Sequence, residues 1–255
     1  MTFISAYFTD IGTKKETNQD ALLIKTAKTS KGNVGLFVVC DGMGGLTNGE
    51  IASTTVIQGL SDWFEKELPD IVLNVNVTDK IIGKHLDEKI RFLNKKIIKY
   101  GKKNGITLGT TLSIFLVIDK KYYIVQIGDS RIYEVGTELL QLTKDQTLVA
   151  REVERGNLTP EQAKFHPRRN VLLQCVGARE EIEVVMTTGN INETHTYLLC
   201  TDGFYHKIDD EELIDFIHNV QDESPMKKNI AELINIAKDR GETDNISAIL
   251  VRCSR

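Results

Sequence analysis

Five aspartates in this 255-residue sequence stand directly beside apolar, strand-like runs. They are Asp20, Asp41, Asp129, Asp202 and Asp244. A single aspartate at a strand end commonly starts a turn, because its short side chain bonds nearby backbone. Side chains at several rigid strand ends can instead converge on one point, as oxygen ligands of hard divalent cations must. The pattern therefore predicts a metal site built from carboxylates.

The chemistry that such a site favours is phosphoester hydrolysis. Carboxylates at this density raise one another's pKa, and bound cations relieve the repulsion. Ligands that are all oxygen select Mg²⁺ or Mn²⁺ over zinc, which recruits His or Cys. With two cations about 3.5 to 4 Å apart that share a carboxylate, a bridging water loses a proton near neutral pH and attacks phosphorus in line.

The sharpest single motif is Asp41-Gly42-Met43-Gly44-Gly45, which follows an apolar run. Glycines after the aspartate let backbone approach a ligand closely. A dinucleotide-binding loop is disfavoured because Thr47 stands where its third glycine belongs. An EF-hand calcium loop is disfavoured because Met43 and Gly45 occupy its ligand positions.

Size and composition indicate a soluble globular protein with one domain over residues 1–255. Apolar residues make up 41% and charged residues 27% of the chain, which disfavours a disordered or fibrous protein. A net charge of −4 without a basic stripe disfavours nucleic acid as a partner. We recognise no membrane span, secretory leader or lipidation motif and so expect a cytoplasmic protein, without membrane partners. The spacing of the four cysteines suggests neither zinc nor redox chemistry, so we expect buried, reduced thiols.

Strand signals come in pairs separated by tight turns, which indicates antiparallel hairpins. The expected strands cover residues 21–24, 34–40, 111–118, 122–127, 131–135, 139–142, 183–187, 196–200 and 246–251. We expect the four between residues 111 and 142 to form one meander.

Helical spacing of apolar residues predicts helices over residues 49–68 and about 79–103, and two more between residues 209 and 241. Thr78 is the expected N-cap of the second, and Ser224 that of the last. The polar segment 145–177 interrupts the pattern and resembles a lid. Helices on antiparallel sheets in four layers would bury every apolar face, so we expect an α+β fold of α-β-β-α type. Five lysines between residues 95 and 103 fall on the polar side of a helix, where we expect a solvated face.

Taken together, the motifs resemble those of bacterial metal-dependent Ser/Thr protein phosphatases of the 2C type, over essentially the whole chain. In order they are Lys15-Glu16-Thr17-Asn18-Gln19-Asp20, Asp41-Gly42-Met43-Gly44-Gly45, Gly109-Thr110-Thr111, Gly128-Asp129-Ser130-Arg131, Thr201-Asp202-Gly203 and Asp244-Asn245. The resemblance implies two antiparallel sheets flanked by helices, with a metal cluster at one end. It also implies phosphorylated protein substrates, including a Ser/Thr kinase or its targets, and we expect a monomer.

The resemblance implies a separate role for each aspartate. Asp41 would bridge two catalytic Mn²⁺ or Mg²⁺ ions, and the Gly42 carbonyl would bind one of them. Asp202 and Asp244 would complete the other, and Asp20 would hold metal-bound waters. Asp129 with Asp202 would form a third, weaker site, and the segment 145–177 would be the flap beside it.

The sequence departs from the family at three positions. Lys15 stands where the family usually has an arginine that grips the substrate phosphate, and it lacks the bidentate fork. Leu46 stands where bacterial relatives often have His. Met43 stands where animal relatives carry a histidine proposed as general acid, so leaving-group protonation would fall to metal-bound water.

Two other functions remain open. Gly128-Asp129-Ser130 resembles the nucleophile block of a GDS-type esterase, for which Asp215 and His218 would complete the site. The fold could also belong to a phosphoprotein-binding module with little catalysis, although every matched aspartate is present. His166 and His206 receive no role.

Overall fold

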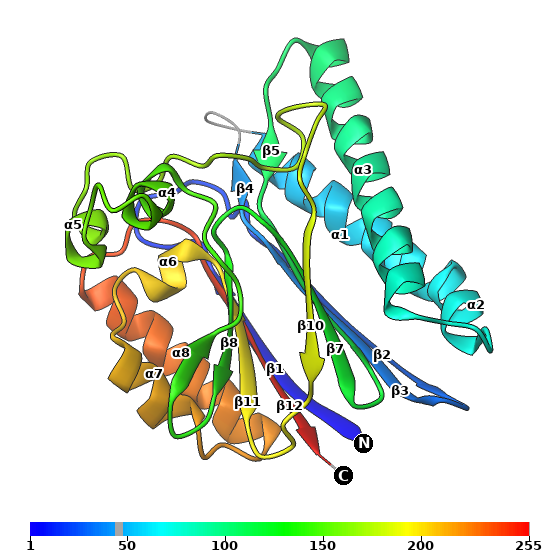
Figure 1. The fold of residues 1–255 in the computed structure, drawn as a ribbon. Helices are drawn as coiled ribbons and strands as arrows, with labels where there is room; N and C mark the ends of the chain where they lie inside the picture. The colour runs from blue at the N-terminus through cyan, green and yellow to red at the C-terminus, as the bar shows by residue number, and fades with distance from the viewer. Residues whose placement is uncertain (44–47, 255) are drawn as a thin grey trace.

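Two five-stranded antiparallel sheets lie face to face at the centre of the molecule (Figure 1). The structure is a computed structural model and describes residues 1–43 and 48–254. The first sheet has the order β1 (Thr2–Asp10), β12 (Ile246–Ser254), β11 (Thr196–Cys200), β8 (Arg131–Val135) and β9 (Leu139–Gln141). The second has the order β10 (Val185–Asn190), β7 (Lys121–Ile127), β6 (Leu112–Ile118), β3 (Gly32–Cys40) and β2 (Ala21–Thr29). Two short strands, β4 (Gly42–Met43) and β5 (Gly109–Thr110), pair at the end of the second sheet.

Helices cover the outer face of each sheet, which confirms the predicted α-β-β-α layers. The second sheet is covered by α1 (Gly49–Lys66), α2 (Leu68–Leu73) and α3 (Asp79–Asn104). The first is covered by α6 (Asp202–Tyr205), α7 (Asp210–Ile217) and α8 (Glu223–Asp239). Two further helices, α4 (Leu148–Glu154) and α5 (Pro160–Lys164), lie in the polar segment 145–177.

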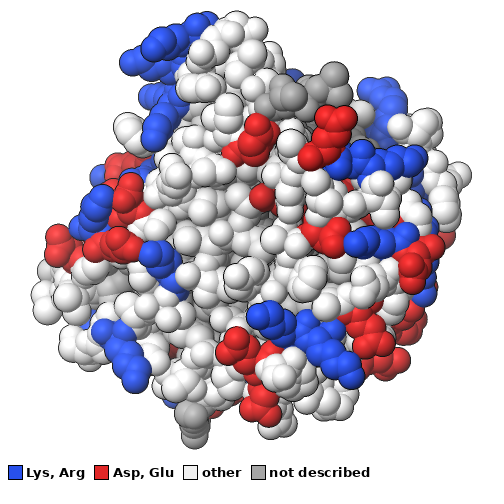
Figure 2. Space-filling model, turned by 180° about the vertical axis from the view of Figure 1, so that it is seen from behind, with Lys and Arg blue, Asp and Glu red and all other residues white. Residues whose placement is uncertain are grey.

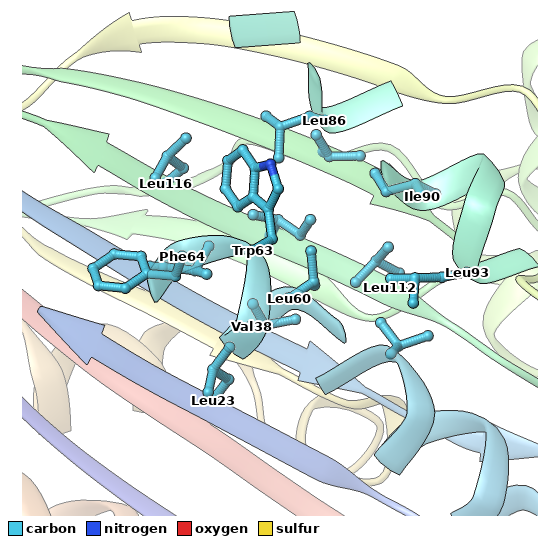
Figure 3. Close-up of a cluster of buried hydrophobic side chains, with 14 of the residues drawn as sticks. Leu23, Val38, Leu60, Trp63, Phe64, Leu86, Ile90, Leu93, Leu112 and Leu116 are labelled. Carbon is cyan, nitrogen blue, oxygen red and sulfur yellow. The ribbon is translucent and has the colours of Figure 1, made fainter. Parts of the chain in front are cut away.

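The buried core forms three layers that match the predicted helix faces. Figure 3 shows the outer layer of the second sheet, where Trp63 of α1 packs near Leu86 of α3 and Leu116 of β6. Between the sheets, the rings of Phe115 and Tyr197 approach to 4.8 Å between centroids. Contacts of this kind hold the two sheets face to face, which positions the ends of their strands relative to one another.

The predicted helix starts are confirmed with one exception. Thr78 caps α3, accepting a hydrogen bond from the Ile81 amide at 3.4 Å. The last helix, α8, begins two residues earlier than predicted, with Asp222 instead of Ser224 at the N-cap position. The difference arises because Pro225 tolerates any position in the first turn, where backbone amides have no helical partner.

The predicted meander of residues 111–142 was wrong. Strands β6 and β7 belong to the second sheet, whereas β8 and β9 belong to the first. The chain crosses between the sheets at Gly128, whose φ of 99° suits glycine. Strand β1 was not predicted at all, because Ala6 is its only fully buried residue and its apolar pattern is correspondingly weak.

The remaining structural expectations concern the surface and the thiols. The lysines between residues 95 and 103 are exposed, as predicted. The four cysteines are free, and three of them, Cys40, Cys200 and Cys253, are buried. Within the described ranges, no helix has both the length and the apolar character needed to cross a membrane.

Candidate metal centre

Strand register brings Asp20 and Asp41 together. Ala21 of β2 pairs with Cys40 of β3, so the residues just outside this pair are neighbours at one end of the second sheet. Both strands are antiparallel, which means that one strand begins where the other ends. The two aspartates therefore come from segments 21 residues apart in sequence and lie at the same edge.

The first sheet contributes the other three aspartates at the same end. Cys200, the last residue of β11, pairs with Arg131 of β8 and Ala248 of β12. Asp202 follows β11, whereas Asp129 and Asp244 precede β8 and β12. All three consequently lie just beyond the same row of paired residues.

A hydrogen bond joins the two groups across the sheets. Thr201, which follows β11 of the first sheet, donates from Oγ1 to Oδ2 of Asp20, which precedes β2 of the second sheet, at 2.9 Å. The Thr201 hydroxyl also accepts from the Ser247 amide at 3.1 Å. Thr201 was part of a quoted motif but received no role from the sequence, because a threonine before an aspartate has many explanations.

The aspartates are close enough to perturb one another's ionisation. Burial is the main cause that raises the pKa of Asp41, and the charges of the other four aspartates raise it further. Burial also raises the pKa of Asp20 to about 7, with added repulsion from Asp202 and Asp244. The pKa of Asp129 and of Asp202 is raised in the same way, first by burial. The carboxylates thus carry more negative charge than the surrounding protein offsets.

The donor set fits a hard divalent cation. Asp20 Oδ1 and Asp202 Oδ1 are buried without a hydrogen-bond partner, which is costly unless an ion or water satisfies them. In residues 1–43 and 48–254, no three His, Cys, Asp or Glu side chains by themselves enclose an ion. Mg²⁺ does not require such a cage, because it usually keeps several waters and takes one or two carboxylates.

The segment around Asp41 is held by its backbone. The Asp41 amide donates to Thr111 Oγ1, and the Thr111 amide donates to the Asp41 carbonyl, both at 2.8 Å. Gly42 is buried, and a Cβ there would lie 2.4 Å from the carbonyl oxygens of Gln19 and Gly49. Only glycine fits, so Asp41 is presented on a backbone that cannot shift easily.

Asn245 holds the loop that precedes Asp20. Its Oδ1 accepts from the Gln19 amide at 2.9 Å, and its Nδ2 donates to the carbonyls of Ile11 and Thr17. The side chain is buried. Asn245 therefore positions both Asp20 and the loop that carries Lys15, a role that its motif alone did not indicate.

Lys15 lies at the margin of the aspartate cluster. Its Nζ is 2.7 Å from Asp244 Oδ1, and its side chain is 42% exposed. Partial burial alone would lower the pKa of Lys15, but Asp244, Asp41 and Asp202 outweigh burial and raise it. The structure thus places Lys15 in contact with Asp244, which the sequence predicted as a metal ligand.

The polar segment 145–177 is anchored beside the cluster at both ends. Gln146 exchanges hydrogen bonds with Gly128, next to Asp129. Val176 exchanges backbone hydrogen bonds at 2.9 Å with Thr110, whose hydroxyl donates to the Asp41 carbonyl. The segment is consequently connected by hydrogen bonds to the backbone on which Asp41 and Asp129 are positioned.

Arg131 links the base of this segment to the cluster. Its guanidinium binds Asp145 with both Nε and Nη2, the shortest distance being 2.7 Å, and lies 3.6 Å from the Tyr205 ring centroid. The Tyr205 hydroxyl donates to the Asp129 carbonyl at 3.1 Å. The Gly-Asp-Ser-Arg motif contained Arg131, but its partners 14 and 74 positions away could not be inferred from it.

The other residues considered from sequence have different surroundings. Ser130 is fully buried and its hydroxyl lies 2.6 Å from Thr111 Oγ1, an environment that disfavours a nucleophile. His206 Nδ1 lies 3.7 Å from Asp202 Oδ2, whereas His166 lies in the exposed part of segment 145–177. Met43 is half-buried in β4. The prediction for Leu46, with Gly44, Gly45 and Thr47, lies outside the described residues.

Comparison with known proteins identifies close similarity over nearly the full chain. The family model described as "Protein phosphatase 2C" matches residues 12–251. Protein phosphatase PhpP from Streptococcus pneumoniae serotype 2 is 31% identical over 246 residues, covering 95% of this chain and 94% of that protein.

Solved structures agree with the sequence relatives. The serine/threonine phosphatase Stp1 from Staphylococcus aureus superposes with a TM-score of 0.88 at 28% identity, covering 100% of this chain and 96% of that one. The catalytic domain of the serine/threonine protein phosphatase PstP, solved in complex with two manganese ions, superposes with a TM-score of 0.80 at 27% identity, with both chains fully covered.

Proposed function

This chain belongs to the protein phosphatase 2C family, and on that premise we propose how its residues carry out the family's reaction. It is a metal-dependent protein serine/threonine phosphatase, a hydrolase that releases phosphate from phosphoserine and phosphothreonine in proteins. The bound cations supply positive charge that activates water and offsets the charge of the phosphoryl group.

Asp41, the Gly42 carbonyl, Asp202 and Asp244 would hold two catalytic cations. Support comes from the convergence of these groups at one edge and from the unpartnered oxygen of Asp202. We propose Asp41 as the ligand shared by both cations, because the charges of Asp20, Asp202, Asp129 and Asp244 all act on its carboxyl group. We propose Mn²⁺ or Mg²⁺, because all the donors are oxygens.

Asp20 would orient water beside the catalytic pair. Its Oδ2 is committed to Thr201, while Oδ1 is buried and unpartnered. One oxygen is therefore fixed and the other is free to accept from a water molecule. Asp129 with Asp202 would form a third, weaker cation site at the base of the flap, residues 145–177.

Lys15 would bind the phosphate of the substrate. Its ammonium is half-exposed at the margin of the cluster and carries three donors, of which Asp244 uses one. An ammonium holds phosphate as a point charge, without the bidentate geometry of arginine. We therefore expect phosphate to be held with less directional preference than an arginine would give.

The observation that carries this assignment is the set of buried carboxylates with two unpartnered oxygens. Phosphate release from a phosphothreonine peptide tests it, measured with Mn²⁺, with EDTA and with Asp41→Asn. We expect activity only in the wild-type protein with Mn²⁺. Circular dichroism of the variant serves as the folding control, and full activity of folded Asp41→Asn would refute the assignment.

We further propose that the enzyme acts in the cytoplasm, as a monomer, on proteins that a Ser/Thr kinase phosphorylates. The four free cysteines suit a reducing compartment. Light scattering of the purified protein tests the monomer, and a mass near twice 28.7 kDa would contradict it.

A further inference from the structure

The last four turns of α3 carry only positive charge. Residues 89–104 include Lys89, Arg91, Lys95, Lys96, Lys99, Lys102 and Lys103 and no aspartate or glutamate, although the whole protein has a net charge of −4. Figure 2 shows Lys and Arg side chains gathered at the upper left, the place of the C-terminal end of α3. This end of the helix is therefore positively charged, whereas the protein as a whole carries a net negative charge.

Four of these residues have no ion-pair partner among the residues that the structure describes. Lys89, Arg91 and Lys102 pair with Glu67, Asp87 and Glu180, whereas Lys95, Lys96, Lys99 and Lys103 form no such pair. Glu180 owes its lowered pKa first to its hydrogen bond with Lys102 and only last to Lys95. The charge of the four lysines is thus available to a partner.

Two exposed aromatic rings lie among the lysines. Phe92 is 61% and Tyr100 42% exposed. Residues three and four apart share one face of a helix, so Phe92, Lys96, Tyr100 and Lys103 follow one another along the outer face of α3. We call Phe92, Lys95, Lys96, Lys99, Tyr100 and Lys103 the basic surface. Beside it is an open hollow of about 270 Å³, lined in part by Ile98, Ile106, Leu108 and Ala178.

The basic surface is close to the aspartate cluster. Only five residues separate Asn104, the last residue of α3, from Thr110, whose hydroxyl donates to the Asp41 carbonyl at 2.9 Å. An extended chain spans at most about 3.5 Å per residue, so the two points are no more than roughly 20 Å apart. A peptide segment of six to eight residues can connect them.

We propose that the basic surface docks an acidic stretch of the protein substrate, at a distance from the phosphorylated residue. This rests on the proposed function, because only a protein substrate extends beyond the reacting phosphate. Opposite charges favour the encounter, and the rings and the adjacent hollow offer contacts for apolar side chains in the same stretch. An anionic membrane is the poorer partner, because the net charge of the protein is negative and the apolar side of α3 is buried in the core.

The test compares two phosphothreonine peptides and three proteins. One peptide has neutral flanks, and the other carries a block of glutamates seven residues from the phosphothreonine, prepared on either side. The proteins are the wild type, a surface variant with Lys95→Gln, Lys96→Gln, Lys99→Gln and Lys103→Gln, and a matched variant with Lys28→Gln, Lys80→Gln, Lys227→Gln and Lys228→Gln. The matched lysines are also exposed and form no ion pair with residues 1–43 or 48–254, so both variants lose the same charge.

For the wild type and the matched variant, we expect the glutamate block to lower KM about tenfold without changing kcat, as several exposed ion pairs together would. In the surface variant this advantage disappears, while hydrolysis of the neutral peptide and of para-nitrophenyl phosphate is unchanged. Equal KM values for both peptides in the wild type would overturn the docking proposal. So would lysine-dependent binding to phosphatidylserine vesicles without any effect on the acidic peptide. No hydrolysis of any substrate by the wild type would instead overturn the proposed function.

Discussion

The Lys15 ammonium lies 2.7 Å from Asp244 Oδ1, so the expected phosphate-binding residue and an expected metal ligand are an ion pair. The pair is at the solvent margin, where Lys15 is 42% exposed. A bound cation would compete with Lys15 for the Asp244 carboxylate and so free the ammonium for the substrate phosphate. If Asp244 binds a cation and Lys15 binds phosphate, as proposed, metal binding and substrate binding would be coupled through the Lys15 side chain.

The first prediction concerns Lys15. Lys15→Met removes the charge and keeps the length of the side chain, so KM for a phosphothreonine peptide should rise about tenfold, the value of one partly exposed charge-assisted hydrogen bond. Steady-state kinetics with saturating Mn²⁺ measure it. Lys15→Arg is the control and should retain or improve KM, because its fork binds phosphate oxygens in pairs. An unchanged KM in Lys15→Met would exclude Lys15 from phosphate binding.

The second prediction is that cations stabilise the fold. Each occupied site adds about 2.7 kcal/mol to the free energy of unfolding when the cation concentration is a hundred times the Kd of that site. In a domain of this size, each kcal/mol raises Tm by roughly 2–4 °C. Two sites should therefore raise Tm by roughly 10 °C or more. Asp41→Asn should remove most of this shift, and should raise Tm in EDTA because it removes one of the buried carboxylates that repel each other. Differential scanning calorimetry of the wild type and of Asp41→Asn, each with Mn²⁺ and with EDTA, measures these Tm shifts. An equal Tm of the wild type with Mn²⁺ and with EDTA would contradict the prediction.

The third prediction is a pH dependence of the metal-free protein. Burial first, and neighbouring aspartates second, raise the pKa of Asp20 from 3.8 to about 7. The folded state then holds this proton more tightly than the unfolded state, so the contribution of Asp20 to stability is fully present below about pH 4 and is lost as pH rises through about 7. Urea unfolding in EDTA between pH 4 and 8 measures the slope. Asp20→Asn should make this slope less steep, and a slope that Asp20→Asn leaves unchanged would assign the effect to other groups.

The fourth prediction concerns Arg131, which is three-quarters buried between Asp145 and Tyr205. Arg131→Lys loses the bidentate bond and should lower the free energy of unfolding by about 2–3 kcal/mol. Because Asp145 begins the flap, trypsin should cleave residues 151–169 faster in this variant. Arg91→Lys is the matched control, because Arg91 binds Asp87 at an exposed position. This substitution should lower the free energy of unfolding by less than about 0.5 kcal/mol. Equal proteolysis of both variants would show that Arg131 does not hold the flap.

Much of this architecture could be predicted from local sequence. The apolar faces of α1, α3 and α8 were predicted because helical periodicity records which side of a helix is buried. The five aspartates were selected because each adjoins a strand, and register places them at one edge. The flap ends were recognised from a change in composition, although not their hydrogen bonds to Gly128 and Thr110.

The sequence by itself determined most of the helices and strands and the order of the motifs, because these follow from side-chain type and short-range spacing. Only the tertiary structure decided that β7 and β8 belong to different sheets, since a hairpin and a crossing look alike along the chain. It also decided that Thr201 binds Asp20, that Arg131 binds Asp145 and that Lys15 binds Asp244. These partners come together because the two sheets pack on each other. The periodicity of a sequence indicates which face of an element is buried, but not which distant residue lies against it.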